Sequence, residues 1–319
     1  MEKGGWQTMI KFYKNRYKFF AISLVLIVLG FVFLGINGMD LSIQFKGGAI
    51  LKYTYQNEID TEQVAAVVSQ TLNRSADVQL TTDLATDTQK VVISLAGTEG
   101  VSAQDQETLD NALKAAFPDN GLNLSESNIV QAFIGKKFLQ NSMIALILSS
   151  ILIVIYVAIR FQKISGLSAG VMALVALFHD VAIVFFTFIV FKLPINESFI
   201  AVALTIIGYS INDTIVIYDR IRENSLANRK MSLADLVDKS INQSLVRSLN
   251  TSLTTVVSIT IVYIFASVYN IESIKVFALP MMVGLISGAY STICIAGPLW
   301  VMWQNHKTKA RETEAKKVH

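Results

Sequence analysis

An aspartate inside an apolar segment is the residue of this 319-residue chain whose surroundings most clearly call for a chemical role. Asp213 follows Asn212 within the stretch IIGYSINDTIVIY, residues 206–218. An unpaired carboxylate in hydrocarbon costs about 2.5 to 3.5 kcal/mol on insertion scales. A spanning segment that carries one therefore predicts a function that needs an ionisable group, such as binding and releasing a proton.

Other polar residues of the apolar segments recur at spacings of three or four and so share helix faces. The simplest arrangement turns these faces toward each other and makes a polar seam inside a helix bundle. Alternatively, the Ser and Thr hydroxyls bond the backbone of their own helices or hold helices together. The candidate supporting network comprises Thr205, Tyr209 and Asn212 beside Asp213, then His179 and Asp180, and then Thr251, Thr254 and Ser258 after Arg247.

A proton relay is the chemistry that fits Asp213 and Arg247. Helix association does not require an ionisable group, because an Asn would hydrogen-bond without the cost of burying a charge. Arg247 stays charged at any relevant pH and enters the membrane from the side that Asp213 is nearest. Burial and a nearby cation act on a carboxyl in opposite directions, as a relay requires. A local hydrogen-bonded pair explains His179 and Asp180 at least as well as a relay does.

The elements that position these residues are membrane-spanning helices. The chain is 52% hydrophobic and only 16% charged, which is typical of a polytopic membrane protein. Six apolar segments are long enough to cross a core of about 30 Å. The first has no signal-peptide cleavage pattern, so we expect an uncleaved anchor. The segments lie near residues 19–37, 140–159, 165–191, 198–218, 251–269 and 274–303.

The distribution of Lys and Arg predicts that both termini are cytoplasmic. Residues 1–18 form one cytoplasmic tail and the basic residues 304–319 the other, with helices 2–6 within 140–303. Residues 38–139 then lie on the far side, with 7 basic and 13 acidic residues and hence a net charge of −6. The overall charge of +3 comes from the cytoplasmic flanks, which disfavours nucleic-acid binding.

Residues 38–139 are predicted to form a small α+β domain. Strands are expected near 40–55, with a break at Gly47-Gly48, and near 76–82, 90–97 and 122–133; helices begin after Asp60 and Ser102. This β-α-β-β-α-β order matches a ferredoxin-like fold. Ser232 and Asp235 also predict a capped amphipathic cytoplasmic helix near 232–249, which would pin Arg247 at the membrane surface.

Signatures of enzymes and cofactor-binding proteins do not occur in the sequence. It has no Cys/His metal cluster, P-loop, nucleophile elbow or GxGxxG motif. We therefore expect no enzymatic activity, metal or cofactor, with protons as the coupling ion. An intramembrane aspartyl protease could pair Asp180 with Asp213, but the HD and ND contexts do not match the YD and GxGD motifs of that class.

Four segments together resemble the signature segments of the SecF family of bacterial protein-export membrane proteins, which is related to the resistance-nodulation-division transporters. They are GYSINDTIVIYDRIREN (208–224), FHDVAIV (178–184), SINQSLVRSLNTSLTT (240–255) and DLSIQFKGGAIL (40–51), and the resemblance extends over the whole chain. It implies an inner-membrane partner of SecD that uses the proton motive force to complete export after SecA has driven preproteins through SecYEG. YajC, YidC and membrane lipids are further implied contacts. By motif, Asp213 resembles the family's proton-relay carboxylate and Arg247 its functionally important arginine.

Two other functions stay open. In the first, the chain forms half of a proton-coupled small-molecule or lipid exporter of the same superfamily. In the second, it is a non-conducting scaffold subunit that tolerates Asp213→Asn. Transporters of this type pair two related halves around a site near the middle of the membrane. A single six-span unit is therefore expected to be half of an assembly.

Overall fold

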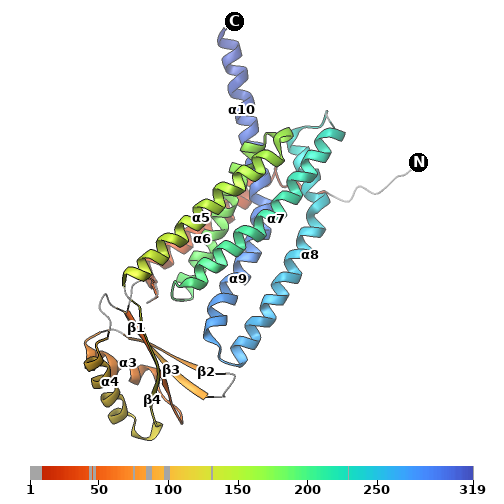
Figure 1. Ribbon diagram of the computed structural model, residues 1–319. Coiled ribbons are helices and arrows are strands. Elements are labelled where there is room, and N and C mark those ends of the chain that lie inside the picture. Colours follow the sequence, from red (N-terminus) through yellow and green to blue (C-terminus); the bar gives the residue numbers. More distant parts are fainter. Residues whose placement is uncertain are drawn as a thin grey trace.

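A computed structural model describes residues 9–42, 45, 48–74, 76–83, 88–96, 101–130, 132–228 and 230–318. It consists of a helical bundle and a small α+β domain, which lies at the end of the bundle opposite the two termini (Figure 1). Within these described residues six helices are long and apolar enough to cross a membrane, which confirms the six predicted spans.

The helices of the bundle form an inner and an outer group. In the apolar windows of α6, α7 and the last span more than half of the residues are buried, against 11% in α1, α5 and α8. The outer helices expose many large apolar side chains, as expected of helices that face lipid. The bounds are α1 (Arg16–Asn37), α5 (Ala132–Arg160), α6 (Gly166–Val190), α7 (Glu197–Ala227), α8 (Leu233–Val268), α9 (Glu272–Ser291), a π-helical segment (Thr292–Ala296) and α10 (Gly297–Val318).

Small residues allow the helices to approach closely. A Cβ atom on Gly166 would lie 2.4 Å from the carbonyl oxygen of Ala158, so the turn between α5 and α6 requires glycine there. A Cβ on Gly30 would lie 2.2 Å from the Phe186 ring, which fixes α1 against α6. Close contacts of this kind are how helices associate in lipid, where no hydrophobic force drives them together.

The cytoplasmic helix predicted near 232–249 is not a separate element. Ser232 caps one continuous helix, α8, that includes the fifth span. Its 36 residues extend about 54 Å at 1.5 Å per residue, well beyond the hydrocarbon core. Leu236, Val237 and Ile241 pack in the core of the bundle, so the amphipathic pattern reflects burial against other helices.

The small domain has the predicted β-α-β-β-α-β order. Its strands are β1 (Gly48–Thr54), β2 (Ala76–Asp83), β3 (Thr88–Ala96) and β4 (Asn123–Val130), and its helices are α3 (Thr61–Leu72) and α4 (Ala103–Ala116). The sheet is antiparallel in the order β2-β3-β1-β4. Gly47, the proposed break in the first strand, lies outside the described residues, and β1 begins at Gly48.

Alternating apolar residues hold this domain together. Leu51 and Tyr53 of β1 pack against Val64 of α3 and Leu109 of α4 in one buried cluster. Ser102 begins α4 with a complete capping box, as predicted. Asp60 caps α3 by accepting a hydrogen bond from the backbone of Glu62.

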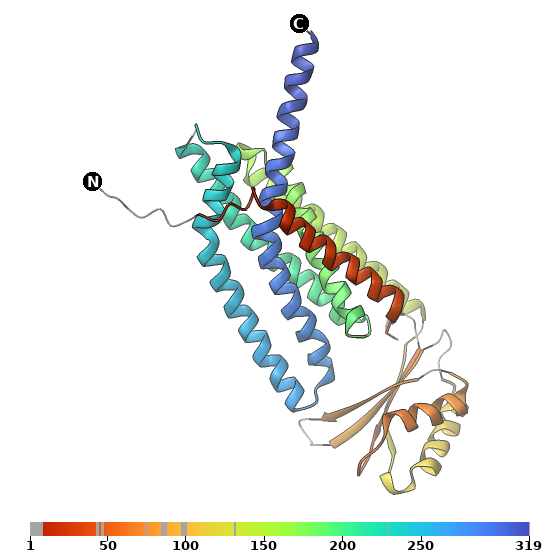
Figure 2. The ribbon, with the colours of Figure 1, turned by 180° about the vertical axis from the view of Figure 1, so that it is seen from behind.

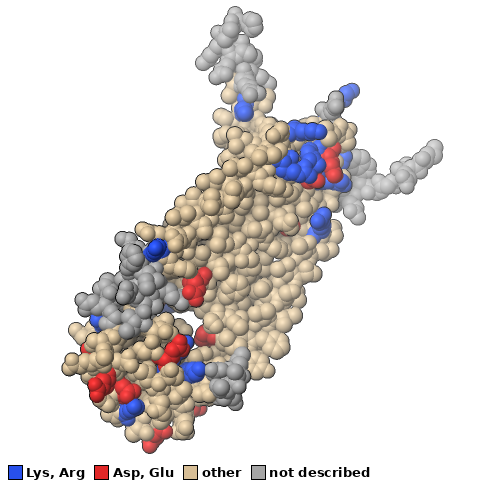
Figure 3. All heavy atoms as spheres, viewed as in Figure 1, with Lys and Arg blue, Asp and Glu red and all other residues tan. Residues whose placement is uncertain are grey.

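A short backbone pairing connects the domain to the bundle. The Ile195 amide, in the turn between α6 and α7, donates to the Asp40 carbonyl, and the Ser42 amide donates to the Ile195 carbonyl. Figure 2 shows the domain beyond the far ends of the bundle helices. On the face drawn in Figure 3, Lys and Arg gather at the end of the bundle where the termini lie, and Asp and Glu lie mainly on the domain.

Candidate functional site

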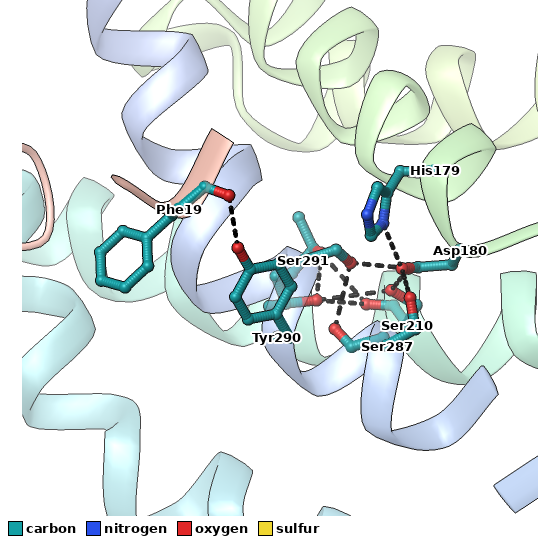
Figure 4. Close-up of polar contacts among 10 residues, drawn as sticks. Phe19, His179, Asp180, Ser210, Ser287, Tyr290 and Ser291 are labelled. Carbon is teal, nitrogen blue, oxygen red and sulfur yellow. Dashed lines mark hydrogen bonds and ion pairs between the residues drawn. The ribbon is translucent and has the colours of Figure 1, made fainter. Parts of the chain in front are cut away.

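Among the described residues of the helical bundle two carboxyl groups are buried, and the first, Asp180, is fully hydrogen-bonded (Figure 4). Its Oδ2 accepts from Ser210 Oγ at 2.8 Å and from Ser291 Oγ at 2.6 Å. Its Oδ1 accepts from Ser287 Oγ at 2.7 Å and lies 3.1 Å from His179 Nδ1. An ionised carboxylate offers about four acceptor sites, and all four are used here. We call these five residues the Asp180 cluster.

The histidine of the Asp180 cluster faces Asp180 through its Nδ1 atom. When Asp180 is ionised it can only accept hydrogen bonds, and His179 Nδ1 then carries the proton of this bond. Its side chain is 8% exposed, and Nε2 has no hydrogen-bond partner within the described residues. The local hydrogen-bonded pair that the sequence allows for His179 and Asp180 is therefore present.

The π-helical segment begins beside the Asp180 cluster. Thr292 Oγ1 lies 3.1 Å from Thr214 Oγ1 and 3.4 Å from Ser210 Oγ, which extends the hydrogen bonds across α7. These hydroxyls and the two serines of α9 that bond Asp180 are not among the residues singled out in the sequence. Ser287 and Ser291 recur at a spacing of four within the sixth apolar segment, and this pattern was the available signal.

Asp213, the second buried carboxyl, has very different surroundings. It is only 5% exposed, yet its Oδ2 has no hydrogen-bond partner in the part of the chain that the structure describes. Tyr209, Arg220 and Asn224 share its face of α7 and all bond to α8: Tyr209 to Thr255, Arg220 to Gln243 and Asn224 to both Ser240 and Gln243. Asp213 therefore faces α8.

The predicted counter-charge, Arg247 of α8, lies near Asp213 without pairing with it. Its charge acts on the Asp213 carboxyl, but no ion pair within 4.0 Å joins the two among the described residues. Arg247 is exposed at the surface of the bundle. Arg247 is thus close enough to act electrostatically on Asp213, while Oδ2 of that carboxyl has no partner among the described residues.

Thr205, Asn212, Thr251, Thr254 and Ser258 of the predicted network make no hydrogen bond to Asp213 among the described residues. Thr205 and Asn212 are exposed, and the Thr205 hydroxyl donates to its own helix at the Ala201 carbonyl. The hydroxyls of Thr251, Thr254 and Ser258 likewise donate to backbone carbonyls of α8. The structure therefore shows the backbone-bonding alternative for these hydroxyls.

The geometry of α8 explains why a broad seam does not form. Its buried face carries Ser248 and Ser252, and Thr254 lies two residues farther along, about 200° around the helix. The Tyr209 hydroxyl reaches α8 at Thr255 instead, at 3.3 Å. Polar residues on α7 and α8 are consequently left on the outside of the bundle: Thr205, Asn212, Arg247, Asn250, Thr254 and Ser258.

Comparisons with known proteins identify the family. The sequence model for the C-terminal part of the protein export membrane proteins SecD/SecF matches residues 109–306. Protein translocase subunit SecF of Petrotoga mobilis is 31% identical over 306 residues, covering 95% of this chain and 99% of the relative. SecF of Thermobaculum terrenum is 33% identical and covers 93% of this chain and 95% of the relative.

Longer proteins of the same kind match as well. The protein translocase subunit SecDF of Bacillus subtilis is 33% identical over 93% of this chain, which corresponds to 38% of that protein. The crystal structure of SecDF from Thermus thermophilus, described as a translocon-associated membrane protein, superposes with a TM-score of 0.77 at 29% identity. It covers 94% of this chain, and this chain spans 39% of it. The chain therefore belongs to the SecD/SecF family of protein export membrane proteins.

Proposed function

We propose that this chain is the SecF half of a complex that, with SecD, uses the proton motive force to complete preprotein translocation after SecA-driven passage through SecYEG. Asp213 carries the coupling proton and Arg247 supplies the nearby positive charge. The observation that supports this proposal most directly is the buried Asp213 Oδ2, which has no partner within the described residues although a cationic side chain acts on the carboxyl.

The contrast between the two carboxyl groups favours Asp213 over Asp180 as the proton carrier. Four hydrogen-bonding groups surround the Asp180 carboxyl, so a proton that binds there must displace at least one of these bonds. Protonating Asp213 removes a buried charge and breaks no hydrogen bond of its side chain among the described residues. Each proton that crosses 100 mV supplies about 2.3 kcal/mol, so a few protons can drive a conformational step.

A second half would complete the site. Polar and charged side chains in membrane helices almost always face protein or water, yet α7 and α8 carry such residues on the outside of this bundle, next to Asp213. SecD is the expected cover, since relatives exist as SecDF proteins in which this chain corresponds to about two fifths of the length. The six spans and the SecF relatives make the chain a multi-pass inner membrane protein.

The proposed function also specifies the membrane topology and the partners of the chain. Both termini are cytoplasmic, and the α+β domain, proposed to be ferredoxin-like, lies on the far side where it works beside SecD. We expect the chain to contact exported preproteins, SecYEG, YajC, YidC and membrane lipids. The chain acts without a cofactor and without enzymatic activity of its own, and the proton is the coupling ion.

A paired substitution on α7 tests the proposal. Asp213→Asn should abolish the stimulation of preprotein export by a proton gradient in inverted membrane vesicles, while the chain still co-purifies with SecD. Asp219→Asn, six residues farther along α7 at the exposed ion pairs with Arg160 and Arg222, is the matched control and should export normally. Normal gradient-dependent export by Asp213→Asn would refute the relay and favour a scaffold subunit.

A further inference from the structure

Two buried serines on α8 have hydroxyls without a hydrogen-bond partner among the described residues. Ser248 is 1% exposed and Ser252 is 5% exposed, and neither Oγ atom reaches an acceptor. Other hydroxyls of the same helix do find one: the Ser240 hydroxyl donates to the Leu236 carbonyl and the Thr255 hydroxyl to the Thr251 carbonyl. An unsatisfied buried polar group costs about 1 to 3 kcal/mol, so two neighbouring cases call for an explanation.

The pairing of α7 with α8 places both serines at about the depth of Asp213. The two helices run in opposite directions and are joined at Tyr209–Thr255 and at Arg220–Gln243. Asp213 lies four residues along α7 from Tyr209 and is therefore level with Thr251, four residues before Thr255. Ser248 and Ser252 lie within one helical turn of that level, on the buried side of α8.

Three unpartnered polar atoms among the described residues thus lie at one depth on the buried sides of α7 and α8. They are Asp213 Oδ2, which can only accept when ionised, and the Oγ atoms of Ser248 and Ser252, which can donate and accept. A water molecule bridges such a set well, because it needs two to four polar partners and can donate to the carboxylate while it bonds the hydroxyls. Apolar ligands and anions fit this set poorly, given the carboxylate.

We propose that Ser248 and Ser252 hold water against Asp213 Oδ2, and that this water site passes the coupling proton to and from that carboxyl. The part of this water in proton transfer rests on the function proposed above. The existence of the water site does not. In the forward step an O–H bond of a hydronium ion breaks and a new O–H bond forms on Asp213 Oδ2, which leaves a neutral water. In the reverse step the carboxyl gives the proton back to that water.

Few charged or titratable side chains surround this water site among the described residues. The charge of Arg247 on α8 acts on Asp213, and Tyr209 lies one turn away on α7. Arg247 carries no transferable proton at relevant pH, since its guanidinium stays protonated. The two serines are positioning residues: they hold the water and do not themselves exchange the proton.

Infrared difference spectroscopy tests the water site directly. The full-length chain, co-purified with SecD and reconstituted in lipid vesicles, is perfused alternately at two pH values in ordinary water and in H2(18)O. Bands that shift with the oxygen isotope report bound water. We expect such a band in the wild type and its loss when Ser248→Ala and Ser252→Ala are combined. Ser244→Ala, one turn earlier on the same buried face, is the matched control and should keep the band.

The export assay tests whether the water takes part in proton transfer. Each serine that holds the water contributes a hydrogen bond worth about 1 kcal/mol, so either single Ala variant should slow gradient-driven export about 5-fold, whereas Ser244→Ala should not. A wild type without any isotope-sensitive band overturns the proposal, as does a band that persists in the double variant. If the double variant fails to assemble, the single variants and the wild type still decide. If the double variant loses the band but Asp213→Asn exports normally, the water site exists and only its part in coupling is refuted.

Discussion

Replacing Asp180 with valine should destabilise the bundle much more than replacing it with asparagine. Valine leaves four donors facing an apolar side chain. Two of them have other acceptors nearby: Ser291 Oγ lies 3.2 Å from the Gly288 carbonyl, and Ser210 Oγ lies 3.4 Å from Thr292 Oγ1. His179 Nδ1 and Ser287 Oγ have no such alternative among the described residues.

The expected cost follows from this count. Two buried groups without a partner cost about 1 to 3 kcal/mol each, or about 2 to 6 kcal/mol together. At about 2 °C per kcal/mol for a chain of this size, Asp180→Val should lower the melting temperature by about 4 to 12 °C. Asp180→Asn keeps one acceptor oxygen, and the serine hydroxyls can rotate to accept from its amide. It should cost roughly 1 to 2 kcal/mol, because it loses charge assistance only.

The assay is the fraction of purified full-length chain that elutes at its folded size after heating. Asp213→Val is the matched control, because that carboxyl makes no side-chain hydrogen bond within the described residues. Removing an unpaired buried charge should leave stability unchanged or raise it. Equal melting temperatures for Asp180→Val and Asp180→Asn, or a larger loss in Asp213→Val, would show that the Asp180 cluster does not anchor the bundle.

Three further outcomes are expected. Ser102→Ala removes the N-cap of α4 and should cost about 1 kcal/mol, measured by hydrogen exchange of the α4 amides; unchanged exchange would contradict this. Gly166→Ala places a Cβ 2.4 Å from a backbone carbonyl of α5 and should cost about 1 to 3 kcal/mol in the heating assay, whereas Gly35→Ala, with nothing within 4 Å, should be neutral. The hydrogen bond from Lys52 lowers the pKa of Glu126, so this pair stabilises the sheet above the unfolded pKa of about 4.3 and the effect is lost as pH falls through the folded value. Lys52→Met should therefore speed amide exchange of β4 at neutral pH and not at strongly acid pH; a pH-independent difference would disprove the assignment.

The elements were predictable because each leaves a local pattern. The six spans follow from apolar segments of sufficient length, and the capping box at Ser102 follows from the Asp three residues later. The alternation in β1 and the order of strands and helices are likewise local in origin. The continuous α8 was not predictable in the same way, because its amphipathic pattern does not distinguish an interfacial helix from one packed on the bundle.

The candidate site was predictable only in part. Asp213 stands out because the cost of burying a carboxylate depends on the residue type and the segment alone. Its neighbours depend on how helices rotate about their axes, which a single sequence does not specify. Thr254 and Ser258 share a face with Arg247, and all three lie on the outside of the bundle, whereas Ser287 and Ser291, over a hundred residues from Asp180, bond its carboxyl group.

The central claim is that Asp213 changes its protonation during coupling while Asp180 does not. The most direct measurement is the carboxylic-acid C=O stretching band in infrared difference spectra of the chain assembled with SecD, recorded as the pH changes. The proposed function predicts a band that titrates in the wild type and in Asp180→Asn and that is absent in Asp213→Asn. A titrating band that persists in Asp213→Asn and disappears in Asp180→Asn would contradict it, because the proton would then reside on the carboxylate that four donors hold.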